Sequence, residues 1–406
     1  MAHVSEPTPE PEPLPEPSAV ADDDHTHEPP PDDEYRVSPL ELFFDLVFVF
    51  AITQVTALMA TDLTWLGVLR GVALLLVVWW AWVGYAWLTN SIPVDEDIRS
   101  RIVVFAAMAA GLVMGLAIPQ AFGDDGLLFG FAYLTVTVLF VLLYMVATRD
   151  NPEMNRAVRR LAPGIMLAPV LVATAGFFDA GVVRAALWTV ALTVTMVSPL
   201  ISGTDGWHVR PAHFAERHGL IIIIALGESV VALGLAASVE PHTAAVVTAS
   251  FLGMTVVAAL WWLYFDVVAL AAERRLTRAT GAERNALARD SYSYLHALMI
   301  LGIVFLALGL KKSLLDLGEP LRLIPSAALF GGVALYLLGH ILFRLRNMGS
   351  VNRQRTVVAV LLVVAIPIGV TVPAFVSLIM LVALLIGLIV YELSAYREVR
   401  HQVRHH

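Results

Sequence analysis

Charged side chains within long apolar segments are the residues of this chain that have the greatest potential for chemistry. Asp45 and Glu228 are carboxylates in such segments, and Arg70 is an arginine in another. An ionisable group at hydrocarbon depth costs at least ~2.5 kcal/mol, so each of the three predicts a functional ion site or a buried ion pair. Glu228, next to Gly227, is the deepest carboxylate. We expect it to pair with Arg70, either as a gate or as a static bridge.

Asp45 lies on a helical stripe with Phe48 and Ile52. The stripe fits two roles for Asp45, namely a transport or ligand-binding role and a static ion pair that fixes one helix to another. One turn earlier, the segment Ser38-Pro-Leu-Glu41 has the spacing of a capping box, with proline at the first helical position. We therefore expect Ser38 and Glu41 to begin a helix, with a structural role.

Three further ionisable residues fall at the depth of Asp45, namely Asp266, His296 and His340. Each histidine follows a tyrosine by one helical turn, as in Tyr292 with His296. A histidine beside a carboxylate could relay protons, and the alternative is a hydrogen-bonded packing residue.

Enzymatic motifs are missing from the sequence. It has no cysteine, no metal-ligand spacing, no phosphate-binding loop, no G-x-S-x-G and no H-E-x-x-H. We therefore predict no metal, no cofactor and no enzymatic activity.

The composition indicates which elements position these residues. The 406 residues are 58% hydrophobic and 15% charged, which is too little polar surface for a water-soluble globule. A span of the bilayer needs about 18 or more apolar residues. The sequence predicts an all-α membrane protein with twelve such helices, near residues 39–59, 64–88, 101–121, 126–147, 161–178, 182–203, 214–237, 243–270, 291–310, 323–345, 354–372 and 374–395.

The distribution of Lys and Arg predicts the orientation. If the chain crosses twelve times, 21 of the 26 basic residues lie on the side of both termini, four on the other side, and Arg70 within a helix. Retained positive charge marks the cytoplasmic side. We expect a multi-pass protein of the bacterial inner membrane with cytoplasmic termini, whose basic loops contact anionic lipid headgroups and no nucleic acid.

The two ends of the chain are expected to lie outside the bilayer. Residues 1–37 hold eleven acidic residues, one basic residue and nine prolines, which predicts a disordered acidic tail and no signal peptide. Residues 397–406 form a short basic C-terminus.

An internal repeat relates the first and seventh predicted helices. At an offset of 175 residues, the segment 41–54 aligns with 216–229. Trp79-Trp80 of the second helix is matched to Trp261-Trp262 of the eighth, at an offset of 182 residues. The alignment predicts two parallel six-helix halves, residues 38–205 and 206–396, related by an axis along the membrane normal. Chance matching of apolar residues is the alternative.

Three blocks in order resemble the bacterial low temperature requirement A family. They are Ser38-Pro-Leu-Glu-Leu-Phe-Phe-Asp-Leu-Val-Phe-Val-Phe-Ala-Ile-Thr-Gln54, Glu216-Arg-His-Gly-Leu-Ile-Ile-Ile-Ile-Ala-Leu-Gly-Glu-Ser229, and Tyr294-Leu-His296 ahead of Gly302-Ile303. The resemblance covers about residues 36 to 395. It implies a multi-pass membrane protein needed for growth in the cold, and it implies no particular biochemical activity.

The first helix alone is similar to that of the lysosomal and bacterial potassium channels with a Phe-Ser-Asp motif. In those channels the first helix of each repeat lines the pore, which would place Asp45, Phe48 and Ile52 on a path. Phe44 stands where the motif has serine, and Leu220 stands where a second repeat would have aspartate.

Two functional hypotheses follow. The first is a channel or transporter for a monovalent cation, a proton or a small solute, with a path between the halves. The second is a non-transporting scaffold or sensor, in which Arg70, Glu228 and Asp45 would all be statically paired. The oligomeric state is open in both.

Overall fold

A computed structural model describes residues 36–395, so most of the predicted acidic tail and the basic C-terminus at 397–406 lie outside the described residues. Within this range the regular secondary structure consists of helices. Its extended contacts are limited to an isolated bridge between Pro320 and Pro373. The predicted all-α class is confirmed.

The first six long helices agree with the predicted segments to within a few residues, with one exception. Four of them begin at a side chain that accepts a hydrogen bond from a backbone N–H of the first turn, namely Ser38, Thr64, Asp97 and Asn151. They are α1 (Pro39–Thr61), α2 (Trp65–Ser91), α3 (Ile98–Ala117) with the short 3-10 helix η2 (Ile118–Gln120), α4 (Gly126–Ala147), α5 (Pro152–Ala175) and α6 (Val182–Ile201).

The remaining helices are less regular, because several crossings are assembled from more than one element. They are α7 (Pro211–Ser238), α8 (Ala244–Phe265), α9 (Val268–Arg278), α10 (Gly281–Leu287), the π-helix η3 (Ala288–Leu295), α11 (His296–Leu315), α12 (Leu323–Ser326), the π-helix η4 (Ala327–Gly331), α13 (Gly332–Met348), α14 (Arg353–Gly369) and α15 (Ala374–Ala395).

Eleven helical stretches within residues 36–395 are long and apolar enough to cross a membrane. The twelfth, α14, has 17 residues and lies at the lower limit for a span. The prediction of about twelve spans is therefore confirmed as eleven to twelve.

Three predicted boundaries were wrong. The helix predicted at 161–178 begins at Pro152, because Asn151 caps it and proline is suited to the first position. The segment 243–270 is broken after Phe265, since Val267 leaves the helical conformation. The segment 291–310 is the middle of a longer stretch from Gly281 to Leu315, which stays helical through the π-helix.

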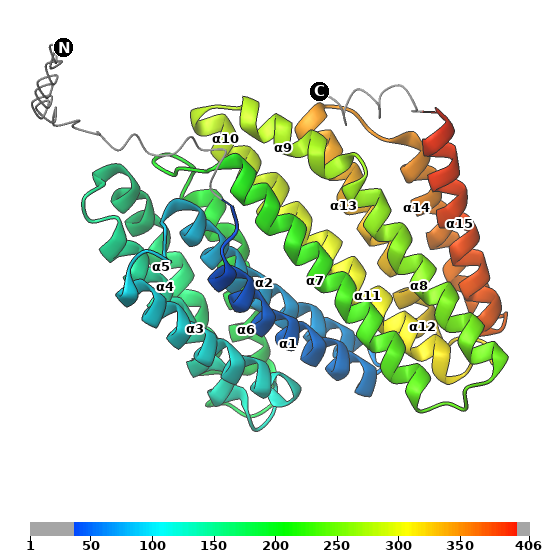
Figure 1. Ribbon diagram of the computed structural model, residues 1–406. Helices are drawn as coiled ribbons and strands as arrows, with labels where there is room; N and C mark the ends of the chain where they lie inside the picture. Colours follow the sequence, from blue (N-terminus) through cyan, green and yellow to red (C-terminus); the bar gives the residue numbers. More distant parts are fainter. Residues whose placement is uncertain (1–35, 396–406) are drawn as a thin grey trace, which may run out of the picture.

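The helices form one bundle in which α7 and α11 run side by side through the middle (Figure 1). Helix α1 packs against α2, α3, α7 and α11, so it belongs to the boundary between the first six helices and the rest. Within each set the first helix packs on the second and third, and the third packs on the fourth. This similarity agrees with two repeats, and the two halves at 38–205 and 206–396 stay a prediction.

Close helix approaches depend on glycine. A Cβ on Gly302 of α11 would lie 2.6 Å from a backbone oxygen of α13, and one on Gly130 would lie 2.4 Å from the backbone of α5. Small residues at such crossings replace the hydrophobic effect as the means of packing helices in lipid. The contact at Gly302 holds α13 close to α11, and the contact at Gly130 holds α5 close to α4.

Candidate functional site

The start of α1 is tied to α7 by buried charges. The capping box is confirmed, since Ser38 Oγ accepts from the backbone N–H of Glu41 and Glu41 Oε2 accepts from that of Ser38. The Glu41 side chain is also buried against α7, where it lies 3.0 Å from His213 Nε2 and 3.4 Å from Arg217 Nη1. Glu41 therefore fixes a tertiary contact as well as a helix end.

Arg217 bridges two carboxylates of α1. Its side chain is fully buried, and Nη2 donates to Asp45 Oδ1 at 2.9 Å. The same oxygen accepts from Trp82 Nε1 of α2 at 2.8 Å. Asp45 thus takes part in an ion pair that joins α1, α2 and α7. We call Glu41, Asp45, His213 and Arg217 the α1–α7 ion cluster.

Phe48 and Ile52 continue the face of α1 that carries Asp45, and both are buried at 2% and 4% exposure. The predicted stripe therefore faces protein on the side of the ion cluster. Beyond the cluster, Asn90 at the end of α2 bonds to His213 Nδ1 and to both backbone groups of Arg210. These bonds fix the start of α7 against the end of α2.

Arg70 does not pair with Glu228, so that prediction was wrong. Arg70 lies near the start of α2, 3.9 Å from Asp62 in the preceding loop, with its guanidinium over the ring of Phe122. Its side chain is 35% exposed. Placing an arginine head group at the membrane interface costs less free energy than placing it in the hydrocarbon interior, and this explains why Arg70 pairs with Asp62.

Glu228 is the deep carboxylate at the contact of α1 and α7. Its residue is 3% exposed, and Oε2 accepts a short hydrogen bond of 2.5 Å from Thr53 Oγ1. The next residue, Ser229, donates to the carbonyl of Ile303 in α11. Among residues 36–395 no basic side chain forms an ion pair with Glu228. It is a buried carboxylate held by a hydroxyl group.

His296 lies at the centre of an aromatic cluster. In the neutral imidazole, Nδ1 donates to the carbonyl of Ser291 at 3.0 Å, so Nε2 accepts from the hydroxyl of Tyr264 at 2.8 Å. Tyr292 stacks on the ring at 5.1 Å, and His218 lies 5.3 Å away edge to face. The π-helix η3 supplies Ser291 and Tyr292, as π-helical turns often do at functional positions.

His340 belongs to a second buried network. It accepts from Arg355 Nη1 at 2.8 Å, and Arg355 makes a two-pronged ion pair with Glu392 at 2.9 Å for each bond. The predicted one-turn pairing with Tyr336 is confirmed, with ring centroids 4.5 Å apart. This network joins α13, α14 and α15.

Asp266 lies at the C-terminal end of α8. It follows the last residue of α8, and its N–H donates to the carbonyl of Trp262. No group of three or more His, Asp or Glu side chains within residues 36–395 is arranged to hold a metal ion.

Sequence reasoning missed Arg217 and His213 as partners of the first helix. A signal was present, because Glu41 and Asp45 are four residues apart and so are His213 and Arg217. Residues at this spacing share one face of a helix. Two faces of opposite charge at the same end of two packed helices are complementary, and the structure brings them together.

Comparisons with known proteins agree on one family. The family model of the bacterial low temperature requirement A protein (LtrA) matches residues 36–390. A protein of Rhizobium meliloti strain 1021, described as uncharacterized, is 30% identical over 326 residues, which are 76% of this chain and 76% of that protein. No solved structure matches the chain.

Proposed function

The chain belongs to the bacterial low temperature requirement A family, and we propose that it moves a proton or a monovalent cation across the membrane with Glu228 as the binding group. The observation that carries this proposal is the state of Glu228, a buried carboxylate with a hydroxyl partner and no ion pair among the described residues.

The physical argument starts from the cost of a buried charge. An ionised carboxylate without a counter-charge costs several kcal/mol or more in an apolar environment. Lys311 acts on Glu228 through space without forming an ion pair, and we propose that Glu228 holds either a proton or a cation. A group with this requirement at the middle of a span is able to exchange its partner with each aqueous side in turn, which is the basis of coupled transport.

The location of Glu228 supports the same proposal. Thr53 of α1 and Glu228 of α7 are 175 residues apart, the offset of the proposed repeat, and they meet at the contact of the first helices of the two halves. Coupled sites of transporters with internal repeats lie near the midplane between the repeats. The resemblance of α1 to potassium-channel first helices would favour a path along these helices.

The ion cluster at the start of α1 has a different role in this proposal. Asp45 and Glu41 share the guanidinium of Arg217, and Glu41 also contacts His213, so both have partners within the protein. We propose that the cluster fixes α1 to α7 at one end, while Glu228 exchanges its ligand deeper in the bundle.

A scaffold or sensor is the second candidate, and specific contacts favour it. Asp45 is paired with Arg217 and Arg70 lies against Asp62, as a scaffold without a path requires. The two candidates differ at Glu228, which a scaffold would keep permanently protonated.

Flux measurements in proteoliposomes test the proposal. The purified protein is reconstituted, and proton uptake and the uptake of K⁺ and Na⁺ are measured with and without a pH gradient. Glu228→Gln retains the shape of the side chain and removes its charge, so it should abolish gradient-driven flux. Glu216→Gln, on the exposed side of the same helix, serves as the matched control and should retain the flux.

The outcomes separate the candidates. Flux that Glu228→Gln abolishes and Glu216→Gln retains supports the proposal. Flux that is independent of the pH gradient and unchanged in Glu228→Gln assigns a passive path elsewhere. No flux above empty liposomes, from folded protein, favours the scaffold.

A further inference from the structure

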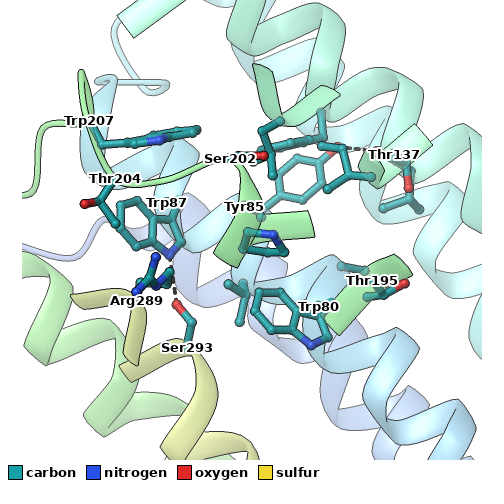
Figure 2. Close-up of a pocket in the computed structure, with 18 of the residues that line it drawn as sticks. Trp80, Tyr85, Trp87, Thr137, Thr195, Ser202, Thr204, Trp207, Arg289 and Ser293 are labelled. Atoms are coloured by element: carbon teal, nitrogen blue, oxygen red, sulfur yellow. Dashed lines mark hydrogen bonds between the residues drawn. The ribbon is translucent and has the colours of Figure 1, made fainter. Parts of the chain in front are cut away.

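A cavity of ≈ 100 Å³ lies within the first six helices, apart from Glu228 (Figure 2). Helices α2, α4, α5 and α6 form its walls, and the segment 202–207 and the π-helix η3 lie at one end. For comparison, a cavity of roughly 150 Å³ lined by apolar side chains binds benzene. The size suits one ring or one alkyl chain segment.

The deep part of the cavity is apolar and aromatic. Trp80, Tyr85 and Tyr133 line it. Their neighbours already satisfy its polar atoms, since Tyr85 donates to the carbonyl of Val136 and Trp80 Nε1 lies against the sulfur of Met196. A ligand in this part is therefore recognised by apolar contact.

The other end is polar and half exposed. Ser202, Thr204 and Arg289 line it, with the indole of Trp207 beside them (Figure 2). Arg289 donates to Asp290 through Nε and Nη2, and the same carboxylate also accepts from Arg346. Two guanidinium groups share the carboxylate of Asp290, so Arg289, the charged residue that lines this end, is only partly neutralised.

Polarity thus changes along the cavity. One wall runs seven residues along α2, from Trp80 to Trp87. The opposite wall runs from Thr195 of α6 to Ser202, the residue after that helix. Each wall is about 10 Å long. Only 17% of the residues in the apolar part of α6 are buried inside the bundle. A ligand could therefore enter past α6 from the bilayer.

We infer that this cavity binds a single-chain amphiphile with an anionic headgroup, such as a fatty carboxylate. The chain lies against Trp80, Tyr85 and Tyr133, and the carboxylate accepts from Arg289. A segment of one chain fits the volume, and two chains side by side, as in a bilayer phospholipid, do not. The occupant also touches Ser293 of η3, whose hydroxyl accepts from Trp87 Nε1, so the site reaches the second half of the protein.

The test is photolabelling of the protein in nanodiscs with a fatty acid that carries a diazirine near the end of its chain. Adducts are mapped by mass spectrometry. We expect them on the segments 80–87, 133–140 and 195–207, rather than on the outer faces of the bundle. A fatty alcohol of the same length and a diacyl phosphatidylglycerol, each with the same photoreactive group, serve as comparison probes.

Two variants separate the parts of the site. Gly84 lines the cavity, and a Cβ there would lie 3.5 Å from the nearest atom of Phe140, an ordinary contact. Gly84→Leu should fill the cavity and abolish these adducts, and leucine is the better helix former. Gly234→Leu is the matched control, because nothing lies within 4 Å of its Cβ position. If the leucine variant does not fold, Gly84→Ala should still lower the labelling.

Arg289→Gln tests the headgroup. It should lower labelling by the fatty acid by about tenfold, the size of a hydrogen bond to a charged group, and leave labelling by the alcohol unchanged. Arg278→Gln, an exposed arginine of α9, is the control. Equal labelling of all variants, or adducts on outer faces alone, would overturn the proposal. Labelling of these segments by the diacyl probe would also overturn it, in favour of a phospholipid.

Discussion

Replacing Arg217 should destabilise the protein more than most single substitutions. Arg217→Met keeps the length and apolar stem of the side chain and removes the charge. Asp45 then loses its cation and retains the indole N–H of Trp82, while Glu41 retains His213 and Ser38. Breaking a buried ion pair by removing one partner costs about 3–5 kcal/mol, because the other charge stays buried without compensation. We expect a loss in the free energy of unfolding of that size.

A double variant tests whether the loss comes from the uncompensated charge. Asn in place of Asp45 still accepts from Trp82 and carries no charge, so Asp45→Asn in the Arg217→Met background should restore most of the lost stability. Unfolding is followed by circular dichroism in mixed micelles as the SDS fraction rises, with the exposed Arg278→Met as control. The reasoning is refuted if Arg217→Met unfolds at the SDS fraction of the control, or if the double variant is less stable than the single one.

Three further predictions follow from other parts of the structure. Gly302→Val should prevent α11 and α13 from packing, because its Cβ would lie 2.6–2.7 Å from backbone atoms of α13. The variant should therefore fail to give a monodisperse peak on gel filtration, and a normal peak would contradict the packing. Tyr264→Phe should lower the free energy of unfolding in the same SDS titration by about 1–3 kcal/mol, because the buried His296 Nε2 loses its hydrogen-bond donor. An unchanged midpoint would show that a water molecule replaces the tyrosine hydroxyl. The backbone N–H and hydroxyl of Ser100 hold the pKa of Asp97 below its ordinary 3.8, so the cap of α3 stabilises the helix above that pH and weakens as the pH falls through the lowered pKa. Amide exchange of Ser100 should therefore rise in this range in the wild type, whereas Asp97→Asn should show no such step.

The fold could be predicted because each span carries its own signal. The segment 126–147 was predicted with the bounds that α4 has, since apolar residues fill it and polar residues flank it. The start of α5 could not be found this way. Arg156, Arg159 and Arg160 interrupt the apolar run, yet they are good helix formers that reach out of the bilayer from the first turns.

The partners in the site were harder to predict than the residues themselves. Glu41, Asp45 and Glu228 could be selected from the sequence, because a carboxylate in an apolar run is rare. That Arg217 pairs with Asp45 and that Arg70 does not pair with Glu228 both depend on which helix ends meet, and apolar periodicity contains no information on that point. Complementary i, i+4 pairs on α1 and α7 do contain it. The π-helix that supplies Ser291 and Tyr292 to His296 has no sequence signature of this kind.

The buried carboxylates of α1 and α7 lie at two depths, and their partners differ between the two. At the end where α1 and α7 begin, both carboxylates of α1 lie within 3.4 Å of the one guanidinium of Arg217, and Trp82 and Asn90 extend the contact to α2. Such a cluster resists separation, because parting the helices would leave charges unpaired. Deeper in the bundle, Glu228 is held by the hydroxyl of Thr53, and exchanging a hydroxyl for a cation or releasing a proton breaks no ion pair. The two helices are therefore fixed to each other at one end, and under the proposed function Glu228 would change its ligand farther along them.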